Sequence, residues 1–403
     1  MTAPHPVPPG PWHATTSALC ASLVGIGLAR FGYAPLIPLL VTAGWFDPAD
    51  SAYLGAANLA GYLAGALAAR PLAARLPPAR LLQAMMLAVT LSFFACAQPL
   101  PFAWFFLWRF VSGIAGGVIM VLAATTVLPH VPITRRGLAG GLIFMGVGLG
   151  VVASATLIPR LLSLGLTATW LGLGGVCLIL TLAAWRGWPA DAHPGHATPG
   201  TPAAPRTQGA IALLLAVYGL NAIGLVPHMV FLVDQVTRGL DRGIETGAAI
   251  WAVFGLGAAV GPVVTGLVGD RIGFALTLRL ALIVQAAAVG LAAASANLGL
   301  IALSALVIGA MTPGIAPVVL GRIRELIPHH HRDQRAAWSR ATIAFALGQA
   351  VGAYGLSALF TATGRYAPLF DVATSALVLA LVLDLAHGLG RAGPPACPQV
   401  PKP

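Results

Sequence analysis

Residues 266–273 read Gly-Leu-Val-Gly-Asp-Arg-Ile-Gly, a tight, charged turn between two apolar stretches that decides the fold of the chain. A weaker copy at residues 71–80 reads Pro-Leu-Ala-Ala-Arg-Leu-Pro-Pro-Ala-Arg. Each turn follows the second apolar stretch of its half of the chain. A turn repeated at the same place in each half predicts two copies of one multi-helix unit.

The composition places both copies in a membrane. Of the 403 residues, 58% are hydrophobic and 8% are charged, whereas a soluble domain carries about 25% charged residues. The chain therefore has too little polar surface to cover a globule in water. The formal net charge of +11 raises the question of nucleic acid. The arginines, however, lie between apolar runs without interleaved aromatic residues, so we expect no nucleic-acid partner.

Twelve stretches are long and apolar enough for spanning helices, which need ~20 mostly apolar residues. They cover residues 16–41, 51–73, 81–100, 102–128, 137–159, 168–185, 209–234, 246–268, 274–294, 297–320, 338–361 and 366–387. They lack the alternation of barrel strands, and a helix satisfies its own backbone hydrogen bonds in lipid. We predict an all-α integral membrane protein with twelve transmembrane helices.

A proline-rich stretch divides these helices into two six-helix halves. Such a composition cannot pack a core and is typical of a semi-extended linker. We predict an N-terminal tail (1–15), a first half (16–186), a linker (187–208), a second half (209–388) and a C-terminal tail (389–403).

The positive charges orient the chain. Loops after even-numbered stretches and the C-terminal tail carry Arg75, Arg80, Arg135, Arg136, Arg186, Arg206, Arg271, Arg322, Arg324, Arg332, Arg335, Arg391 and Lys402. The opposite loops carry Arg160, Arg238, Arg242 and Arg365. Because cytoplasmic loops hold the excess of Lys and Arg, we expect both termini and the linker in the cytoplasm, with the helices in a bacterial inner membrane. The first apolar run has no basic residue before it, so we expect no cleaved signal peptide.

Several predicted helices carry glycines four residues apart. The pairs are Gly61 and Gly65, Gly113 and Gly117, Gly137 and Gly141, Gly146 and Gly150, Gly257 and Gly261, and Gly348 and Gly352. Small residues at this spacing let helices approach closely in lipid. The alternative is that glycine is simply common, with 48 in the chain. Equivalent helices of the two halves hold most of the pairs, which favours helix interfaces.

The sequence shows no motif of an enzyme or a metal site. It lacks His-Glu-x-x-His, Gly-x-Ser-x-Gly and a phosphate-binding glycine loop. We therefore expect no catalytic residue, no cofactor and no nucleotide-driven pump. The four cysteines show no metal or disulfide spacing. The run of His329, His330 and His331 does not share one helical face, so we interpret it as a solvated basic loop rather than the alternative, a metal site.

The two halves and their turns resemble the major facilitator superfamily over nearly the whole chain. In that family the turn lies in the cytoplasmic loops after helices 2 and 8, and the second copy here matches it at Gly266, Asp270, Arg271 and Gly273. The first copy departs from the pattern, because Ala74 stands in place of the acid and Pro77 in place of the glycine. Arg75 and Arg80 remain in the first copy.

Two further stretches carry the resemblance. Arg109-x-x-x-Gly113 resembles a family motif whose arginine is associated with proton coupling, and residues 30–38, Arg-Phe-Gly-Tyr-Ala-Pro-Leu-Ile-Pro, look like the YbfB/YjiJ-type branch. The glycine-rich fifth stretch resembles a third motif without its usual proline. The resemblance implies the major facilitator fold, but the branch does not define a substrate.

Arg30 falls near the middle of the first predicted helix, beside Tyr33. A charge at the bilayer centre costs ~2.5–3.5 kcal/mol on insertion scales, so we expect Arg30 to face a wet cavity on the substrate or proton pathway, with Tyr33 as a further candidate for that pathway. The alternative is a structural arginine that binds carbonyls freed by Pro35. Arg109 is a second candidate for this pathway, and its alternative is an anchor at the outer interface beside Trp104 and Trp108.

Asn221, His228 and Gln235 recur every seven residues in the seventh stretch and share one helical face. We expect Asn221 and His228 to line the pathway, with His228 as a candidate proton-linked group. The alternative is a set of satisfied hydrogen-bonding residues. Gln349 in the eleventh stretch is a further pathway candidate, and its alternative is polar contact between helices.

The turns themselves are candidate gates. Asp270 and Arg271 can bridge to neighbouring helices on the cytoplasmic side and hold one access state, with Gly266, Gly273, Arg75 and Arg80 around them. The alternative is an ordinary loop ion pair, which contributes about 0–1 kcal/mol.

These observations favour a secondary active transporter that works by alternating access around a site near the bilayer midplane. The deep arginines favour a small organic anion as substrate, with a proton as the coupling ion and membrane lipids as the surroundings of a monomer. The alternatives are multidrug-type efflux of amphipathic compounds and a non-transporting membrane sensor on the same scaffold.

Overall fold

The structure is a computed structural model that describes residues 10–189, 205–328 and 330–389. The predicted tails up to residue 9 and from residue 390, residues 190–204 of the predicted linker, and His329 lie outside the described residues. Within the described ranges every regular element is helical.

The first part of the chain forms seven α-helices and several short helical turns. In order they are α1 (Pro11–Ser22), the π-helical turn η1 (Leu23–Leu28), the 3-10 turn η2 (Phe31–Leu36), α2 (Ile37–Thr42), α3 (Pro48–Arg75), α4 (Pro78–Ala95), α5 (Phe102–Val127), η3 (Leu128–His130), η4 (Ile133–Arg135), α6 (Arg136–Leu162) and α7 (Leu166–Ala184).

The second part of the chain is likewise helical. Its elements are α8 (Pro205–Val226), the π-helical turn η5 (Pro227–Phe231), α9 (Leu232–Asp234), η6 (Gln235–Gly239), α10 (Gly243–Ile272), α11 (Phe274–Ala294), α12 (Leu298–Leu326), α13 (His331–Thr363) and α14 (Ala367–Leu389). In each half the first long helix is interrupted by a π-helical turn.

Eleven helical segments within the described residues are long and apolar enough to cross a membrane. Their mean hydropathy reaches 2.1 in Phe102–His130, Ile133–Leu162 and Thr207–Gly239. The 28-residue helix α3 lies outside this set and packs along α5. These segments make the chain an integral multi-pass membrane protein of all-α class.

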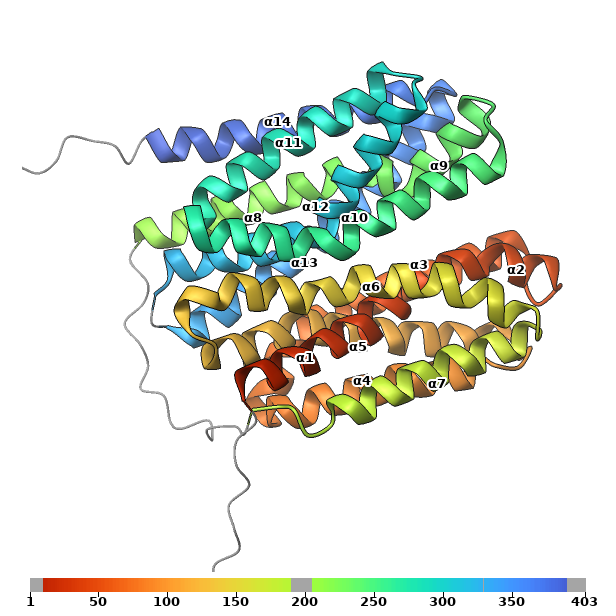
Figure 1. Cartoon of the computed structure of the whole chain (residues 1–403), viewed down its shortest axis with the longest axis horizontal. Coiled ribbons are helices and arrows are strands. Elements are labelled where there is room, and N and C mark those ends of the chain that lie inside the picture. The colour runs from red at the N-terminus through yellow and green to blue at the C-terminus, as the bar shows by residue number, and fades with distance from the viewer. Residues whose placement is uncertain (1–9, 190–204, 329, 390–403) are drawn as a thin grey trace, which may run out of the picture.

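The helices gather in two groups (Figure 1). Helices α1 to α7 form one group and α8 to α14 the other. The start of α1, the end of α7, the start of α8 and the end of α14 all lie at one end of the molecule, on the left in Figure 1. We call this the linker end and the opposite end the far end.

Glycines bring helix backbones into direct contact within each group. A Cβ atom on Gly65 of α3 would stand 2.1 Å from the carbonyl oxygen of Ile114 in α5, and one on Gly113 would stand 2.1 Å from that of Asn58. In the second group a Cβ atom on Gly261 of α10 would stand 2.0 Å from the carbonyl oxygen of Ala310 in α12. The prediction that the glycine pairs form helix interfaces is confirmed.

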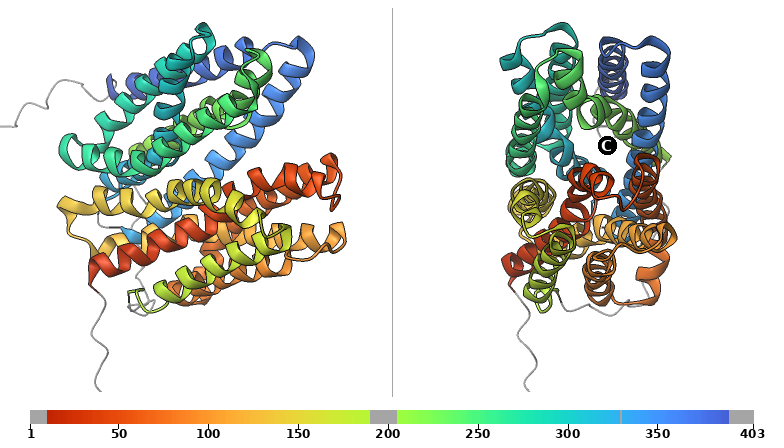
Figure 2. Two further views of the ribbon diagram at one scale, coloured as in Figure 1. Left: turned by 45° about the vertical axis from the view of Figure 1, so that its right-hand side comes forward. Right: turned by 90° about the vertical axis from the view of Figure 1, so that its right-hand side faces the viewer.

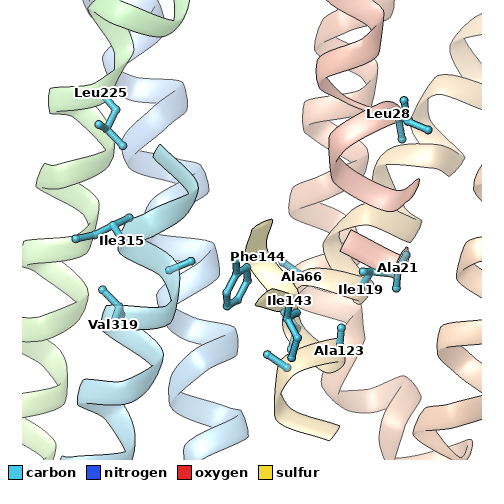
Figure 3. Packing of buried hydrophobic residues seen from close by; sticks show 14 of the residues in the cluster. Ala21, Leu28, Ala66, Ile119, Ala123, Ile143, Phe144, Leu225, Ile315 and Val319 are labelled. Carbon is cyan, nitrogen blue, oxygen red and sulfur yellow. The ribbon is translucent and has the colours of Figure 1, made fainter. Parts of the chain in front are cut away.

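The same contact joins the two groups to each other. Along α6, Gly137, Gly141 and Gly148 lie against Gly266, Pro262 and Ala258 of α10. We call this line of contacts the glycine seam. Buried hydrophobic side chains of both groups lie next to this seam. In Figure 3, Phe144 of α6 points toward the side on which Ile315 of α12 lies.

The glycine contacts predict that adding a methyl group lowers the stability of the protein at one position and not at another. Gly65→Ala forces the α3 and α5 backbones apart, and overpacking costs about 1–3 kcal/mol. Gly175→Ala in α7 adds the same methyl where no atom lies within 4 Å, so helix propensity alone predicts no loss. Thermal unfolding of the purified protein in detergent measures both. Equal melting temperatures would contradict the role of the α3–α5 contact.

Candidate functional site

The first helix of the chain is broken at the depth of Arg30. The π-helical turn η1 ends at Leu28, and the 3-10 turn η2 contains Pro35, which has no backbone donor. The Tyr33 N–H donates to the carbonyl of Arg30 at 3.4 Å instead of to that of Ala29, which an α-helix would use. The break therefore leaves the Ala29 carbonyl open to another donor.

Arg109 of α5 supplies that donor. Its Nη1 donates to the Ala29 carbonyl at 2.8 Å, and its guanidinium carbon lies 4.0 Å from the ring centroid of Tyr33. The Tyr33 hydroxyl in turn donates to the carbonyl of Ser51 at 3.1 Å. Arg109 and Tyr33 are both buried inside the first group of helices. Arg109 and Tyr33 therefore hold the broken helix in place. The alternative role considered for Arg30 from the sequence, binding a freed carbonyl, belongs to Arg109.

The side chain of Arg30 instead reaches from the first group of helices to the second. Its Nη2 donates to Oε1 of Gln349 in α13, and the rings of Phe31 and Tyr62 lie 5.5 Å and 5.4 Å from its guanidinium carbon. Other arginines of the described residues do form ion pairs, for example Arg238 with Asp234, Arg279 with Asp384 and Arg322 with Glu325. Arg30 therefore has aromatic rings and one neutral amide around it, and it forms no ion pair within the described ranges.

A cavity of about 380 Å³ opens beside this link. Ligand pockets in proteins measure about 300–1,000 Å³. Its walls come from α3, α8, η5 and α13, and its lining residues are Arg30, Ala56, Leu59, Ala60, Tyr62, Leu63, Val226, Met229, Val230, Ala346, Leu347, Gln349, Ala350, Ala353 and Tyr354. Arg30 is the one charged side chain among these described residues, and most of the others are apolar.

Aromatic side chains close the cavity toward the linker end. Nε1 of Trp338 in α13 donates to the carbonyl of Met120 in α5 at 2.9 Å. The ring of Trp338 lies 5.9 Å from that of Phe144 and 6.3 Å from that of Tyr218. A hollow of about 40 Å³ remains between this aromatic floor and Arg30. These contacts join the two groups of helices between the cavity and the linker end.

The predicted polar face of the seventh stretch packs against other helices. Nδ2 of Asn221 donates to Oε1 of Gln285 at 2.8 Å, and Nε2 of His228 lies 2.7 Å from Oγ of Ser304. Nε2 of Gln235 donates to the carbonyl of Ala292 at 3.3 Å. None of these residues of the face belongs to the described lining of the cavity. The face therefore joins α8, η5 and η6 to α11 and α12.

Asp270 caps the first turn of α6 from the other group of helices. Its Oδ1 accepts from the Gly137 N–H at 2.7 Å and its Oδ2 from the Leu138 N–H at 2.8 Å. An anion there satisfies two donors that a helix start leaves unpaired and complements the helix dipole. The sequence predicted a contact of Asp270 with a neighbouring helix, but not that its partners are the backbone N–H groups of Gly137 and Leu138.

The rest of the turn has local roles. Gly273 has φ of 83°, a left-handed conformation that favours glycine, and Oε1 of Glu325 accepts from the Phe274 N–H at 2.7 Å. Glu325 was missed from sequence, because no motif marks it. Arg271, Arg75 and Arg80 are exposed, and within the described ranges their side chains form no hydrogen bond or ion pair.

A separate polar cluster lies at the far end. Asp234 accepts from Arg238 and, at 2.6 Å, from the hydroxyl of Tyr366. Burial and this bond to Asp234 raise the pKa of Tyr366, in the loop before α14, to about 12. The cluster pairs charges at the end of a helix and lies outside the cavity.

Comparison with known proteins agrees with this architecture. The model of a family described as "Uncharacterised MFS-type transporter YbfB" matches residues 22–385. No curated protein sequence matches the chain significantly.

Solved transporters share the fold at low sequence identity. The human organic anion transporter MFSD10 superposes with a TM-score of 0.74 at 16% identity, over 93% of this chain and 100% of that one. A bacterial homologue of the iron transporter ferroportin, in its outward-facing state, gives 0.68 at 13% identity, over 93% and 99% of the two chains. The E. coli fucose:proton symporter gives 0.68 at 14% identity, over 92% and 98%.

The bond between Arg109 and Ala29 predicts a stability effect. Arg109→Met keeps an apolar stem but leaves the buried Ala29 carbonyl without its donor, which costs about 1–3 kcal/mol. Arg160→Met in α6 changes an exposed arginine and serves as the control, with an expected effect within about 0.5 kcal/mol. Thermal unfolding measures both, and an unchanged melting temperature of Arg109→Met would refute the structural role.

Proposed function

We propose that this chain, which belongs to the family of MFS-type transporters YbfB, moves a small organic anion across the membrane by alternating access. One observation carries the proposal. Arg30 lies between the two groups of helices, lines the cavity and bonds to a neutral amide of the opposite group.

The chemistry of the guanidinium supports an anion. Arginine carries five N–H donors and stays charged, and Gln349 supplies one neutral acceptor. A charge at the bilayer centre costs ~2.5–3.5 kcal/mol, and a carboxylate that accepts two parallel bonds would offset part of this cost. A cationic substrate would add a second uncompensated charge.

The proposed topology has twelve spans in two six-helix halves, with α3 as the twelfth. The excess of arginines at the linker end favours a cytoplasmic position for that end, the linker and both termini. We place the helices in a bacterial inner membrane. In this orientation the aromatic floor closes the cavity toward the cytoplasm, and the structure corresponds to an outward-facing state.

The link between Arg30 and Gln349 suggests how binding moves the halves. A carboxylate that takes the guanidinium competes with the Gln349 oxygen, the acceptor that ties the halves together at this depth. The halves then rock around the occupied site. A proton as the coupling ion stays a prediction from sequence, since Arg109 and His228 both lie away from the cavity lining.

The contact of Asp270 with α6 is the proposed cytoplasmic gate. It joins the halves below the cavity, and it must break before the cytoplasmic side opens. The first copy of the turn has Ala74 in place of the acid, so its side chain cannot cap a helix start as Asp270 does.

Arg30→Gln tests the substrate class. We expect a carboxylate that stabilises the purified protein to bind about 10–150-fold more weakly to the variant, which corresponds to the loss of a charged hydrogen bond worth ~1.5–3 kcal/mol. Arg30→Lys keeps the charge without the planar fork and should lose less affinity. Thermal-shift titration with organic anions, cations and neutral metabolites measures the effect. Stabilisation of both proteins by cations alone would overturn the anion proposal.

Uptake into proteoliposomes separates transport from sensing. The proposal expects the stabilising anion to cross the bilayer with the wild-type protein and not with Arg30→Gln. Binding without any transport under ion gradients of either direction would favour the sensor.

Asp270→Asn tests the gate. The amide loses the charge at the start of α6, and a change of 1–2 kcal/mol shifts an equilibrium by about 5–30-fold. We expect the variant to populate the inward-facing state more often, read as faster maleimide labelling of Met120→Cys in a background without native cysteines.

Asp384→Asn is the matched control, because its carboxylate pairs with Arg279 inside one group of helices at 2.8 Å. It removes the same charge at the same end of the molecule. Equal labelling rates in both variants would reduce Asp270 to a structural cap.

A further inference from the structure

The two halves meet along two sides of the cavity, and the two sides differ. On one side the glycine seam runs from Gly137 against Gly266 to Gly148 against Ala258. Beyond the seam, toward the far end, a Cβ atom on Gly255 of α10 would still stand 3.4 Å from the Val151 side chain of α6. Figure 2 (right), a view from the far end, shows α6 in yellow beside α10 in green on this side.

On the other side α3 and α13 meet at the linker end. Oγ of Ser339 in α13 donates to the carbonyl of Ala66 in α3 at 3.2 Å. Farther along, toward the far end, residues 56–63 of α3 and 346–354 of α13 line the cavity. We call this stretch the α3–α13 opening.

The opening exposes apolar side chains at the middle of both helices. Leu59 is 47% exposed and Leu347 is 49% exposed, and both line the cavity. Of the most apolar part of α13 only 11% is buried, against 83% for the span that contains α5. Residues at the middle of a spanning helix lie at the depth of the hydrocarbon core. The stretch between α3 and α13 therefore combines exposed apolar side chains, a place in the cavity lining and the depth of the hydrocarbon core.

We propose that the α3–α13 opening is a lateral entrance for an amphipathic anion with one charged head and an apolar tail. The inference rests on the proposed anion transport and names its substrate class. The head binds Arg30, and the tail lies between α3 and α13, where it can enter from the outer leaflet without leaving the hydrocarbon.

The lining selects this class over compact polar anions. Each methylene transferred from water to an apolar wall contributes ~0.8 kcal/mol. A substrate rich in hydroxyls would leave them unpaired against alanine, leucine and valine, at a cost of about 1–3 kcal/mol for each group. A polyanion would find one cation, because Arg30 is the one charged residue of the described lining.

The test uses dodecanoate with a photoreactive diazirine at the end of its tail, mixed into liposomes that hold the full-length protein. After illumination, mass spectrometry locates the labelled peptides. We expect labels on residues 56–63 and 346–354, and loss of these labels in Arg30→Gln, which cannot hold the head.

Two pairs of tryptophan variants test the entrance. Leu59→Trp and Leu347→Trp narrow the opening. Leu91→Trp in α4 and Leu379→Trp in α14 are matched controls, with the same residue at the same exposures of 47% and 49% but outside the cavity lining. We expect the two variants at the opening to reduce labelling by about tenfold or more, the factor that a steric cost of ~1.4 kcal/mol produces, and the controls to leave it unchanged.

Two results would overturn the inference. Labels spread evenly over lipid-facing helices would show that dodecanoate meets the protein only as a lipid, and equal labelling in all four tryptophan variants would remove the entrance. Benzoate separates this failure from that of the transport proposal. If benzoate stabilises the wild type but not Arg30→Gln while dodecanoate fails to label, anion binding stands and the lateral entrance falls.

Discussion

A guanidinium at the middle of a membrane must be solvated by protein, water or ligand, and the rest of this structure depends on how Arg30 meets that requirement. The first helix breaks at this residue, so the backbone between η1 and η2 loses part of its own hydrogen bonding. Arg109 satisfies the freed Ala29 carbonyl from inside the same group of helices. Arg30 is thereby left to face the cavity, where Gln349 of the opposite group is its acceptor. The unused donors define the chemistry of the site.

Glycine determines which parts of the molecule can move against each other. Where carbonyl oxygens stand 2.0–2.4 Å from the position of a missing Cβ atom, as in α3 against α5 and α6 against α10, the backbones lie in direct contact and larger residues do not fit. Small residues of this kind replace the hydrophobic driving force that helices lack in lipid. The α3–α13 side has no comparable contact along its cavity-lining stretch within the described ranges. The halves are thus held together firmly on one side and loosely on the other.

The sequence predicted an all-α membrane fold with close glycine contacts because composition and glycine spacing each act locally. It also identified Arg30 and Gln349 as separate candidates, and the fold brings them together. It could not show that Arg109 and Tyr33 brace a broken helix, because that depends on where a carbonyl loses its donor. The even spacing of Asn221, His228 and Gln235 predicted a shared face, but spacing does not tell which neighbour covers a face. The backbone partners of Asp270 were likewise not predictable, since an acid that caps a helix from a distant segment of the chain leaves no local motif.

A structure of the protein with dodecanoate bound would show whether Arg30 binds the charged group of the substrate. We expect a carboxylate within hydrogen-bond distance of the Arg30 guanidinium, the Gln349 oxygen displaced from it, and the tail between α3 and α13. A ligand bound elsewhere, with the Arg30–Gln349 bond intact and the cavity empty, would contradict it.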